Sequence, residues 1–385
     1  MDIIPSYDIE NINLKEYNLE IRKIILSNLK RYTKLKIFEC DKCNLTDLSE
    51  LPNTLIHFDC NHNNLTKLPD LPNLLVYLDC SYNYRLIELP NLPNSLTHLY
   101  CNDNNLTELR ELPELPNSLI ELRCYRNNLT KLPTLPSSLT KLYCWRNNLT
   151  KLHELPNSLI LLDCSHNNLT ELPNLPNSLT VLWCNRNKLI ELPELPNSLT
   201  ELHCYYNKLT QLPNLHNLLN ELYCFNNNLT ELPNLPNSLN ELRCENNNLT
   251  KLPELTNSLI ELNCRNNNLT ELPDLPNLLQ ILDCENNNLT ELPDLPNSLT
   301  VLGCLDNNLT YLYLKFKTIN EKIKTINETN KINLKNKILK RMEVLNRTLL
   351  LEHSARICLN PKRIKRLLDN LEINFFDGSF DTLTS

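Results

Sequence analysis

Hydrophobic and polar positions recur every 20 residues through most of the chain. The unit around Cys124 shows the pattern, with Leu119, Leu122, Cys124 and Leu129 apolar and Asn127 polar. It matches the leucine-rich-repeat pattern LxxLxLxxNxL, with cysteine in the place of the third leucine. Because side chains alternate between the faces of a strand, Leu122 and Cys124 should point inward. Each unit therefore predicts one short strand, and stacked units predict a parallel sheet.

The cysteines follow the same register. Fourteen of the 16 occupy one position of the repeat, and only Cys43 and Cys358 fall outside it. The fourteen are Cys40, Cys60, Cys80, Cys101, Cys124, Cys144, Cys164, Cys184, Cys204, Cys224, Cys244, Cys264, Cys284 and Cys304. We interpret them as small apolar side chains that fill the core. A disulfide array or a zinc site is the alternative, but Cys40 and Cys43 are the only close pair and have no histidine nearby in sequence.

An asparagine stands three residues after the cysteine in thirteen units. These residues are Asn63, Asn83, Asn104, Asn127, Asn147, Asn167, Asn187, Asn207, Asn227, Asn247, Asn267, Asn287 and Asn307. We expect their amides to lie inside and to bond the backbone of adjacent turns, because buried backbone groups need partners. This contact would also explain how the chain turns with only 2 glycines. The first unit has Cys43 at this position and should lack it.

The second half of most units holds two prolines three residues apart, as at Pro133 and Pro136. Such spacing forbids a helix and favours an extended, polyproline-like segment. The predicted fold is a leucine-rich-repeat solenoid with a parallel β-sheet on its concave face, an extended, polyproline-like convex side and short α-helical caps. We predict an N-terminal helical cap over residues 1–34, about 14 repeats over 35–314, and a basic, largely helical C-terminal region over 315–385.

The two ends of the chain differ from the repeats. Apolar residues at roughly helical spacing in residues 9–34 predict an amphipathic capping helix; they are Leu14, Leu19, Ile21, Ile24, Ile25 and Leu29. A degenerate partner-docking motif is the alternative. Residues 311–385 hold 15 basic and 8 acidic residues, whereas residues 1–310 hold the other 23 and 37. There we expect an edge strand at Leu312 and Leu314, then helices, and we interpret the basic cluster as a solvated helix face rather than a nucleic-acid or lipid contact.

The positions one before and one after the cysteines, and the position two after them, carry aromatic and basic residues in the middle of the array. We predict a partner-binding stripe on the concave face made of Tyr100, Arg123, Tyr125, Tyr143, Trp145, Arg146, Trp183, Arg186, His203, Tyr205, Tyr223 and Phe225. Tyrosine, tryptophan and arginine dominate the hot spots of protein interfaces. The alternative is that aromatic residues simply suit strands. The acidic repeat body makes nucleic acid an unlikely partner, so a protein is expected.

The sequence shows no pattern of an enzyme. Two glycines leave no room for a phosphate-binding loop, and neither Gly-x-Ser-x-Gly nor His-Glu-x-x-His occurs. We therefore expect no catalysis, no cofactor and no metal; only Cys358 or His353 of the tail offers other chemistry. No apolar stretch approaches the roughly 18–20 residues that cross a bilayer, and no signal peptide is readable. These features favour an intracellular protein.

The run Leu-Pro-Asn-Ser-Leu-Thr-Glu-Leu-x-Cys-x-x-Asn-x-Leu-Thr-x-Leu-Pro resembles the short repeats of bacterial effectors of the YopM and IpaH type. The resemblance covers roughly residues 35–314 and implies their solenoid fold. IpaH-type effectors add a ubiquitin ligase domain with a Cys-x-Asp motif, whereas here Leu359 and Asn360 follow Cys358, so no ligase activity is expected. YopM-type proteins imply a binding scaffold.

The bias toward Asn, Ile, Lys and Leu, together with the basic tail, also resembles the repeat proteins of giant viruses of the mimivirus type. That resemblance implies a place in the host cytoplasm or an association with the virus particle. A competing function is therefore a structural spacer, in which the array matters only as a rigid rod. An effector activity in the C-terminal tail is a third, weaker hypothesis.

Overall fold

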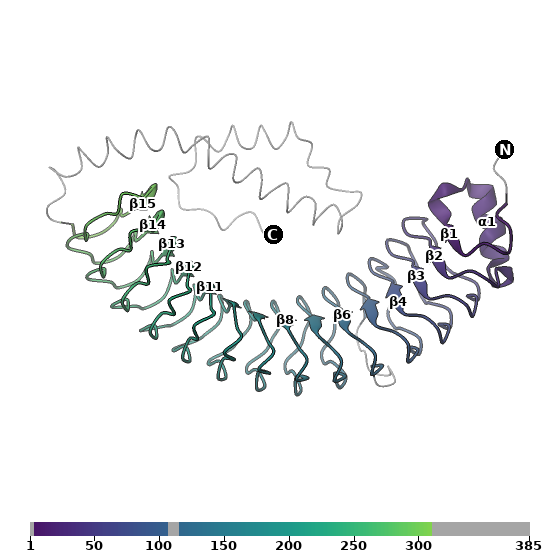
Figure 1. The fold of residues 1–385 in the computed structure, drawn as a ribbon, viewed down its shortest axis with the longest axis horizontal. Helices are drawn as coiled ribbons and strands as arrows, with labels where there is room; N and C mark the ends of the chain where they lie inside the picture. The colour runs from purple at the N-terminus through teal and green to yellow at the C-terminus, as the bar shows by residue number, and fades with distance from the viewer. Residues whose placement is uncertain (1–3, 107–114, 310–385) are drawn as a thin grey trace. The chain divides into compact units, whose positions relative to one another are not determined.

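A computed structural model describes residues 4–106 and 115–309. In this part of the chain, fifteen strands form one parallel sheet in chain order, along the inner side of the repeat array (Figure 1). They are β1 Asn11–Asn13, β2 Ile37–Glu39, β3 His57–Asp59, β4 Tyr77–Asp79, β5 His98–Tyr100, β6 Glu121–Arg123, β7 Lys141–Tyr143, β8 Leu161–Asp163, β9 Val181–Trp183, β10 Glu201–His203, β11 Glu221–Tyr223, β12 Glu241–Arg243, β13 Glu261–Asn263, β14 Ile281–Asp283 and β15 Val301–Gly303. The predicted leucine-rich-repeat solenoid is confirmed.

The core is a continuous column of leucine and cysteine. Leu122 at the centre of β6 pairs in register with Leu142 of β7, and both are fully buried. Cys124 directly follows β6 and is also fully buried, as the alternation predicts. The fifteen cysteines of the described residues are free thiols. Each fully buried leucine contributes roughly 1.5–3 kcal/mol of hydrophobic free energy, and the repeat multiplies that gain along the array.

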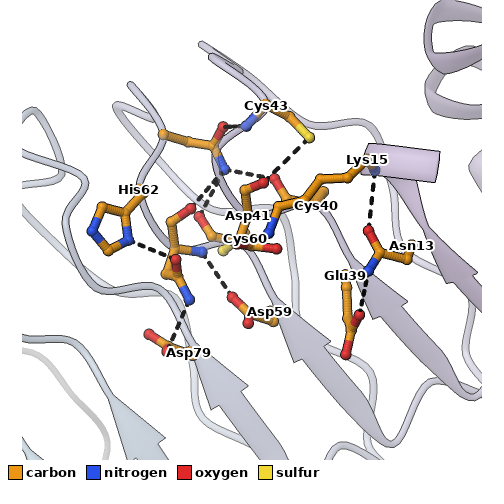
Figure 2. Close-up of polar contacts among 12 residues, drawn as sticks. Asn13, Lys15, Glu39, Cys40, Asp41, Cys43, Asp59, Cys60, His62 and Asp79 are labelled. Atoms are coloured by element: carbon orange, nitrogen blue, oxygen red, sulfur yellow. Dashed lines mark hydrogen bonds and ion pairs between the residues drawn. The ribbon is translucent and has the colours of Figure 1, made fainter. Parts of the chain in front are cut away.

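The asparagine ladder has the predicted geometry. At its first rung the Nδ2 group of Asn63 donates to the carbonyl oxygens of Cys40 and Cys60, both at 2.9 Å. Figure 2 labels Cys40, Cys43 and Cys60 at this place. The Oδ1 atom of Asn63 accepts from the backbone N–H groups of Cys43 at 3.1 Å and Leu45 at 2.9 Å. One amide thus satisfies backbone groups of two adjacent turns that would otherwise be buried without partners. Cys43 itself supplies no such amide.

The residue before each ladder position turns the chain in place of glycine. We call this set the turn row; it has φ angles between 50° and 56° and comprises Lys42, His62, Tyr82, Asp103, Arg126, Arg146, His166, Arg186, Tyr206, Asn226, Asn246, Asn266, Asn286 and Asp306. Such left-handed backbone costs a side-chain-bearing residue roughly 1–2 kcal/mol, and asparagine and aspartate tolerate it best. The backbone N–H of Arg126 donates to the carbonyl of Trp145 at 2.9 Å, which ties the row to the next turn.

The convex side is extended, and a second ladder, not foreseen from the sequence, links the turns just before the strands begin. Ser158 donates its hydroxyl to the carbonyl of Leu139 in the preceding turn at 2.6 Å, and Ser178 does the same to Leu159. The described residues from 40 onward contain no helix. The serine of the recurrent Pro-Asn-Ser-Leu segment is therefore a structural residue, because its hydroxyl links neighbouring turns on the side opposite the asparagines.

The first turns of the chain close one end of the solenoid. Strand β1 pairs with β2, and α1, Leu19–Ser27, follows with the side chain of Asn18 accepting from the N–H of Ile21 at its start. Two 3-10 turns flank this helix, η1 Leu14–Glu16 and η2 Leu29–Arg31. Polar contacts fasten this segment to the first repeat, among them Asn13 with Glu39 at 2.8 Å (Figure 2).

The expected amphipathic helix is shorter than its pattern of apolar residues suggested. Ile21 and Ile25 are buried on α1, but Leu19 and Ile24 are 70% and 36% exposed. A nine-residue helix presents only one narrow face to the solenoid end, so apolar residues elsewhere around it remain in solvent. Leu14 and Leu29 are buried from the 3-10 turns instead.

The chain divides into two compact units, Met1–Phe316 and Lys317–Ser385, and every described residue lies in the first. The edge strand at Leu312 and Leu314, the helices expected after it and the chemistry of Cys358 all lie outside the described residues. Among the residues that are described, none of the helices has the length and apolar character needed to cross a membrane.

Replacing Asn147 by alanine should lower the free energy of unfolding by about 2–5 kcal/mol, since several buried backbone groups lose their partner. The Nδ2 group of Asn147 donates to the carbonyls of Cys124 and Cys144, and its Oδ1 accepts from Leu129. Chemical denaturation followed by circular dichroism measures the change. The matched control is Asn148→Ala, which removes an exposed asparagine one residue away. Equal stability of the two variants would contradict the role of the ladder.

Iodoacetamide should label Cys43 and Cys304 well before the thirteen buried cysteines of the described residues. Burial raises the pKa of the core thiols, to about 12 for Cys124, so almost no reactive thiolate is present at neutral pH. Peptide mass spectrometry after timed labelling gives the rate at each site, and unfolded protein serves as the reference. Equal labelling rates at all cysteines of the native protein would show that the buried cysteines are not protected from solvent.

Candidate functional site

The outward side chains of the strands form a continuous surface, which we call the strand face. It consists of the first and third residues of each strand, the residue after each cysteine, and the turn row. Neighbouring strands of a parallel sheet lie about 4.8 Å apart. Side chains at the same repeat position therefore stack directly on one another, and the residue types along each row decide what the surface can bind.

The first aromatic cluster begins with a sandwich on β5, β6 and β7. The guanidinium of Arg123 lies over the ring of Tyr100 at 4.4 Å and faces the ring of Tyr143 at 5.3 Å. Its Nε donates to Glu121 at 2.7 Å, and Lys141 lies 3.6 Å from the same carboxylate. Burial lowers the pKa of Arg123, but the bond to Glu121 and its charge outweigh burial and raise that pKa overall. The arginine is thus held rigidly between two rings.

The same cluster continues on the residues after the cysteines. Tyr125 and Trp145 stack with ring centroids 4.6 Å apart and planes 11° from parallel. Arg126 and Arg146 approach the Trp145 ring at 5.0 and 5.5 Å, and Arg126 also pairs with Asp103 at 3.3 Å. Tyr125 is only 5% exposed, so this predicted binding residue is covered by its neighbours and supports Trp145 rather than offering a surface.

The second aromatic cluster lies on β9 to β12. Trp183, His203 and Tyr223 occupy the third position of successive strands and stack nearly parallel, at 5.7 and 4.3 Å. The Tyr223 hydroxyl donates to Glu241 at 2.6 Å, which fixes the end of the stack. Burial, with the charge of Arg243, lowers the pKa of His203 to about 4 although Glu241 opposes the shift, so its imidazole is neutral at physiological pH.

A parallel stack runs beside it on the residues after the cysteines. Tyr205 and Phe225 stack at 4.3 Å, and Arg243 lies over Phe225 at 4.9 Å. Arg186 of the turn row lies over the ring of Tyr206 at 4.3 Å. All six predicted residues from Trp183 onward therefore meet in this region, either in the two stacks or at their edge.

The predicted stripe is interrupted between the two clusters. The turn of β8 presents Asp163 and Ser165, whereas the turn of β7 presents Tyr143 and Trp145 and the turn of β9 presents Trp183 and Asn185. Asp163 is 5% exposed and accepts from the N–H and hydroxyl of Ser165 at 3.1 and 2.6 Å. Burial raises the pKa of Asp163 to about 6, against the lowering effect of those bonds. The surface therefore has two separate aromatic clusters with a polar turn between them.

Aromatic residues near the N-terminal end were missed in the sequence. His57 and Tyr77 stack at 4.3 Å with planes 4° apart, and Tyr77 meets Tyr100 edge-on at 5.3 Å. In the turn row, His62 stacks on Tyr82 at 4.1 Å. Our prediction used the positions one before and one after the cysteines and, for Arg146 and Arg186, the position two after them. The strand alternation, extended one step back to the position three before the cysteine, would have found His57 and Tyr77.

Carboxylates lie beside these rings. Asp59 and Asp79, both labelled in Figure 2, occupy the third position of adjacent strands. Asn61 bridges them, donating its backbone N–H to Asp59 at 3.0 Å and its amide to Asp79 at 3.2 Å. Burial and the nearby charge of Asp79 raise the pKa of Asp59 to about 7. A second acidic row, Glu201, Glu221, Glu241 and Glu261, follows the first position of β10 to β13 in direct register.

One group in the described part of the chain has metal-ligating side chains close together. Ligand atoms of Glu201, His203 and Glu221 all lie within 4.8 Å of one another. The cluster was not foreseen, because Glu221 reaches it from the neighbouring strand. One imidazole and two carboxylates fall short of the four cysteine and histidine ligands of a structural zinc site. The ring of His203 is also already engaged between two others, so we assign no metal there.

Similarities to known proteins indicate a family for this chain. No protein-family model and no curated protein matches the chain. Among solved structures, YopM from Yersinia pestis, described as a leucine-rich effector protein, is 33% identical; the likeness covers 74% of this chain and 93% of that one, with a TM-score of 0.57. YopM from Yersinia enterocolitica WA-314 is 34% identical over 71% of this chain and 74% of that chain, with a TM-score of 0.50.

The functional domain of InlJ from Listeria monocytogenes, which includes a cysteine ladder, is also similar. It is 28% identical over 68% of this chain and 61% of that chain, with a TM-score of 0.52. None of these similarities indicates a catalytic family. This chain has the repeat period, the asparagine ladder and the extended convex side, and its similarity to YopM from Yersinia pestis covers most of both proteins. The chain belongs to the YopM-like family of leucine-rich-repeat proteins.

Proposed function

We propose that this protein is an interaction module that binds a protein partner on its strand face. The two aromatic clusters carry the proposal. Leucine-rich-repeat folds are generally protein-interaction modules, which supports the class of function. The family alone does not locate the contact, so the argument for the strand face comes from this chain's own side chains.

The clusters have the composition and rigidity of interface hot spots. Tryptophan, tyrosine and arginine are the residues whose truncation most often costs binding energy. Here Trp145 is held by Tyr125 and two arginines, and Trp183 is held by His203. Side chains that are already ordered lose little conformational entropy when a partner arrives. Their half-buried rings keep an outward edge that a partner can cover.

We place this activity inside a host cell. The described cysteines form a closely spaced column of free thiols, which suits a reducing compartment. The similarity to YopM, an effector protein, supports the same setting. The resemblance to giant-virus proteins rests on composition and remains a prediction. The competing role as a rigid spacer would leave the clusters without a purpose, and the experiment below separates the two.

Replacing Tyr143, Trp145, Trp183 and Tyr223 together by serine should reduce recovery of the partner from host-cell lysate by about tenfold or more, since such residues dominate interface energy. Affinity capture with quantitative mass spectrometry compares the variant with the intact chain. A photo-crosslinking amino acid at position 143 should attach the same partner covalently, whereas one at position 218, outside the strands, should not.

The matched control replaces four exposed apolar residues that lie outside the strands, Leu74, Ile190, Leu218 and Leu278, by serine. Circular dichroism and melting curves establish that both variants keep the fold. Equal capture by the intact chain and by the aromatic variant would reject a binding role for the strand face. It would favour the spacer or a role for the terminal segments.

A further inference from the structure

Basic side chains occupy four successive turns of the turn row. They are Arg126, Arg146, His166 and Arg186, and we call them the arginine row. Three steps of about 4.8 Å make the row about 14 Å long. We propose that the arginine row binds a short acidic segment, about four or five residues long, in the protein partner. This inference rests on the proposed function and specifies the chemistry of the partner at one place on the strand face.

The backbone gives no reason for arginine at these positions. The φ angles of Arg126, Arg146 and Arg186 are 50°, 50° and 54°, in the left-handed region. Four later turns solve the same problem with asparagine, at Asn226, Asn246, Asn266 and Asn286. Asparagine tolerates left-handed backbone better than arginine does. Residues that cost backbone energy gather at functional sites, and these arginines are therefore kept for their side chains.

The row concentrates positive charge that the described residues compensate only at one end. Arg126 pairs with Asp103 at 3.3 Å. Arg146 and Arg186 are exposed, and within residues 4–106 and 115–309 neither forms an ion pair. Partial burial lowers the pKa of Arg146, and so do the neighbouring charges of Arg126 and Arg186. An incoming anion would relieve this mutual repulsion.

Aromatic rings hold the guanidinium groups in place. Arg126 and Arg146 lie against Trp145 at 5.0 and 5.5 Å, and Arg186 lies over Tyr206 at 4.3 Å. A guanidinium that packs its face on a ring keeps its N–H groups at the edge, where a carboxylate can accept two of them. His166 is neutral, because burial and the three arginines lower its pKa to about 4. The anion therefore meets three fixed charges.

The surroundings favour a short carboxylate segment over a long polyanion. Within the row's own turns, the carboxylates of Glu121 and Asp163 are buried and already engaged, the first with Arg123 and Lys141 and the second with Ser165. Past Arg186 the strand face carries the glutamate row that begins at Glu201, and before Arg126 it carries Asp103 and Asp79. A nucleic acid running along the array would meet these carboxylates within a few turns and be repelled. An extended peptide advances about 3.3 Å per residue, so four or five acidic residues match the length of the row and do not reach Asp79 or the glutamate row.

The test measures binding of fluorescein-labelled pentaglutamate to the full chain by fluorescence anisotropy at low ionic strength. The variant is Arg146→Asn with Arg186→Asn, which introduces the residue that four other turns already use. Its melting temperature should be at least that of the intact chain, and its affinity for the peptide should fall about tenfold or more. The matched control, Lys131→Asn with Lys251→Asn, removes the same charge from exposed positions outside the strand face and should bind like the intact chain.

Equal affinities of the intact chain and the arginine variant would overturn the proposal. So would tighter binding of decathymidylate than of pentaglutamate, which would mark a nucleic-acid site, or full competition by equimolar inorganic phosphate, which would mark a general anion site. In the partner-capture experiment, loss of the partner by both the aromatic and the arginine variants supports the inference. If only the aromatic variant loses the partner, the proposed function stands, but the inference of an acidic segment is rejected. If both variants still capture the partner as the intact chain does, the proposed function and the acidic-segment inference are both rejected.

Discussion

The asparagine amide inside each turn is the interaction on which the rest of this structure depends. The solenoid buries the ends of its strands, where the backbone leaves the sheet and its polar groups lose their ladder partners. Asn147 shows the solution, since its amide bonds carbonyls of its own turn and of the preceding one, and its oxygen accepts an N–H of the preceding turn. With that contact in place, the residue before it can adopt left-handed backbone without being glycine.

That arrangement has a functional consequence. Because glycine is not needed at the turn, the turn row can carry arginine, tyrosine and histidine, and it delivers them to the edge of the strand face. Because the spacing between turns is constant, side chains at the same repeat position stack on one another. The tryptophans at 145 and 183 become ordered by their neighbours rather than by a pocket. A surface made this way is a row of local clusters, as expected when each repeat contacts only the next.

Columns of cysteine and serine stabilise the array at other positions of the repeat. Thiols fill the space behind the strands, and InlJ, whose domain includes a cysteine ladder, shows the same use of cysteine in a related fold. Serine hydroxyls link the turns just before the strands, as Ser158 does with Leu139. Between them, the two polar ladders and the apolar column account for most of the invariant letters of the repeat. The remaining variable letters are the ones that face outward and distinguish one turn from another.

The sequence by itself determined the repeat, the inward positions of Leu122 and Cys124, the bonding role of the asparagines and the absence of helix on the convex side. These follow from a period of 20 residues, because in a solenoid each contact joins a residue to its counterpart one period away. Only the tertiary structure decided how the outward groups meet: that Tyr125 is covered, that Asp163 is buried against Ser165, and that Ile24 is exposed on α1. Those outcomes depend on how unlike side chains of adjacent turns orient against each other, and periodicity carries no information about residues that do not repeat.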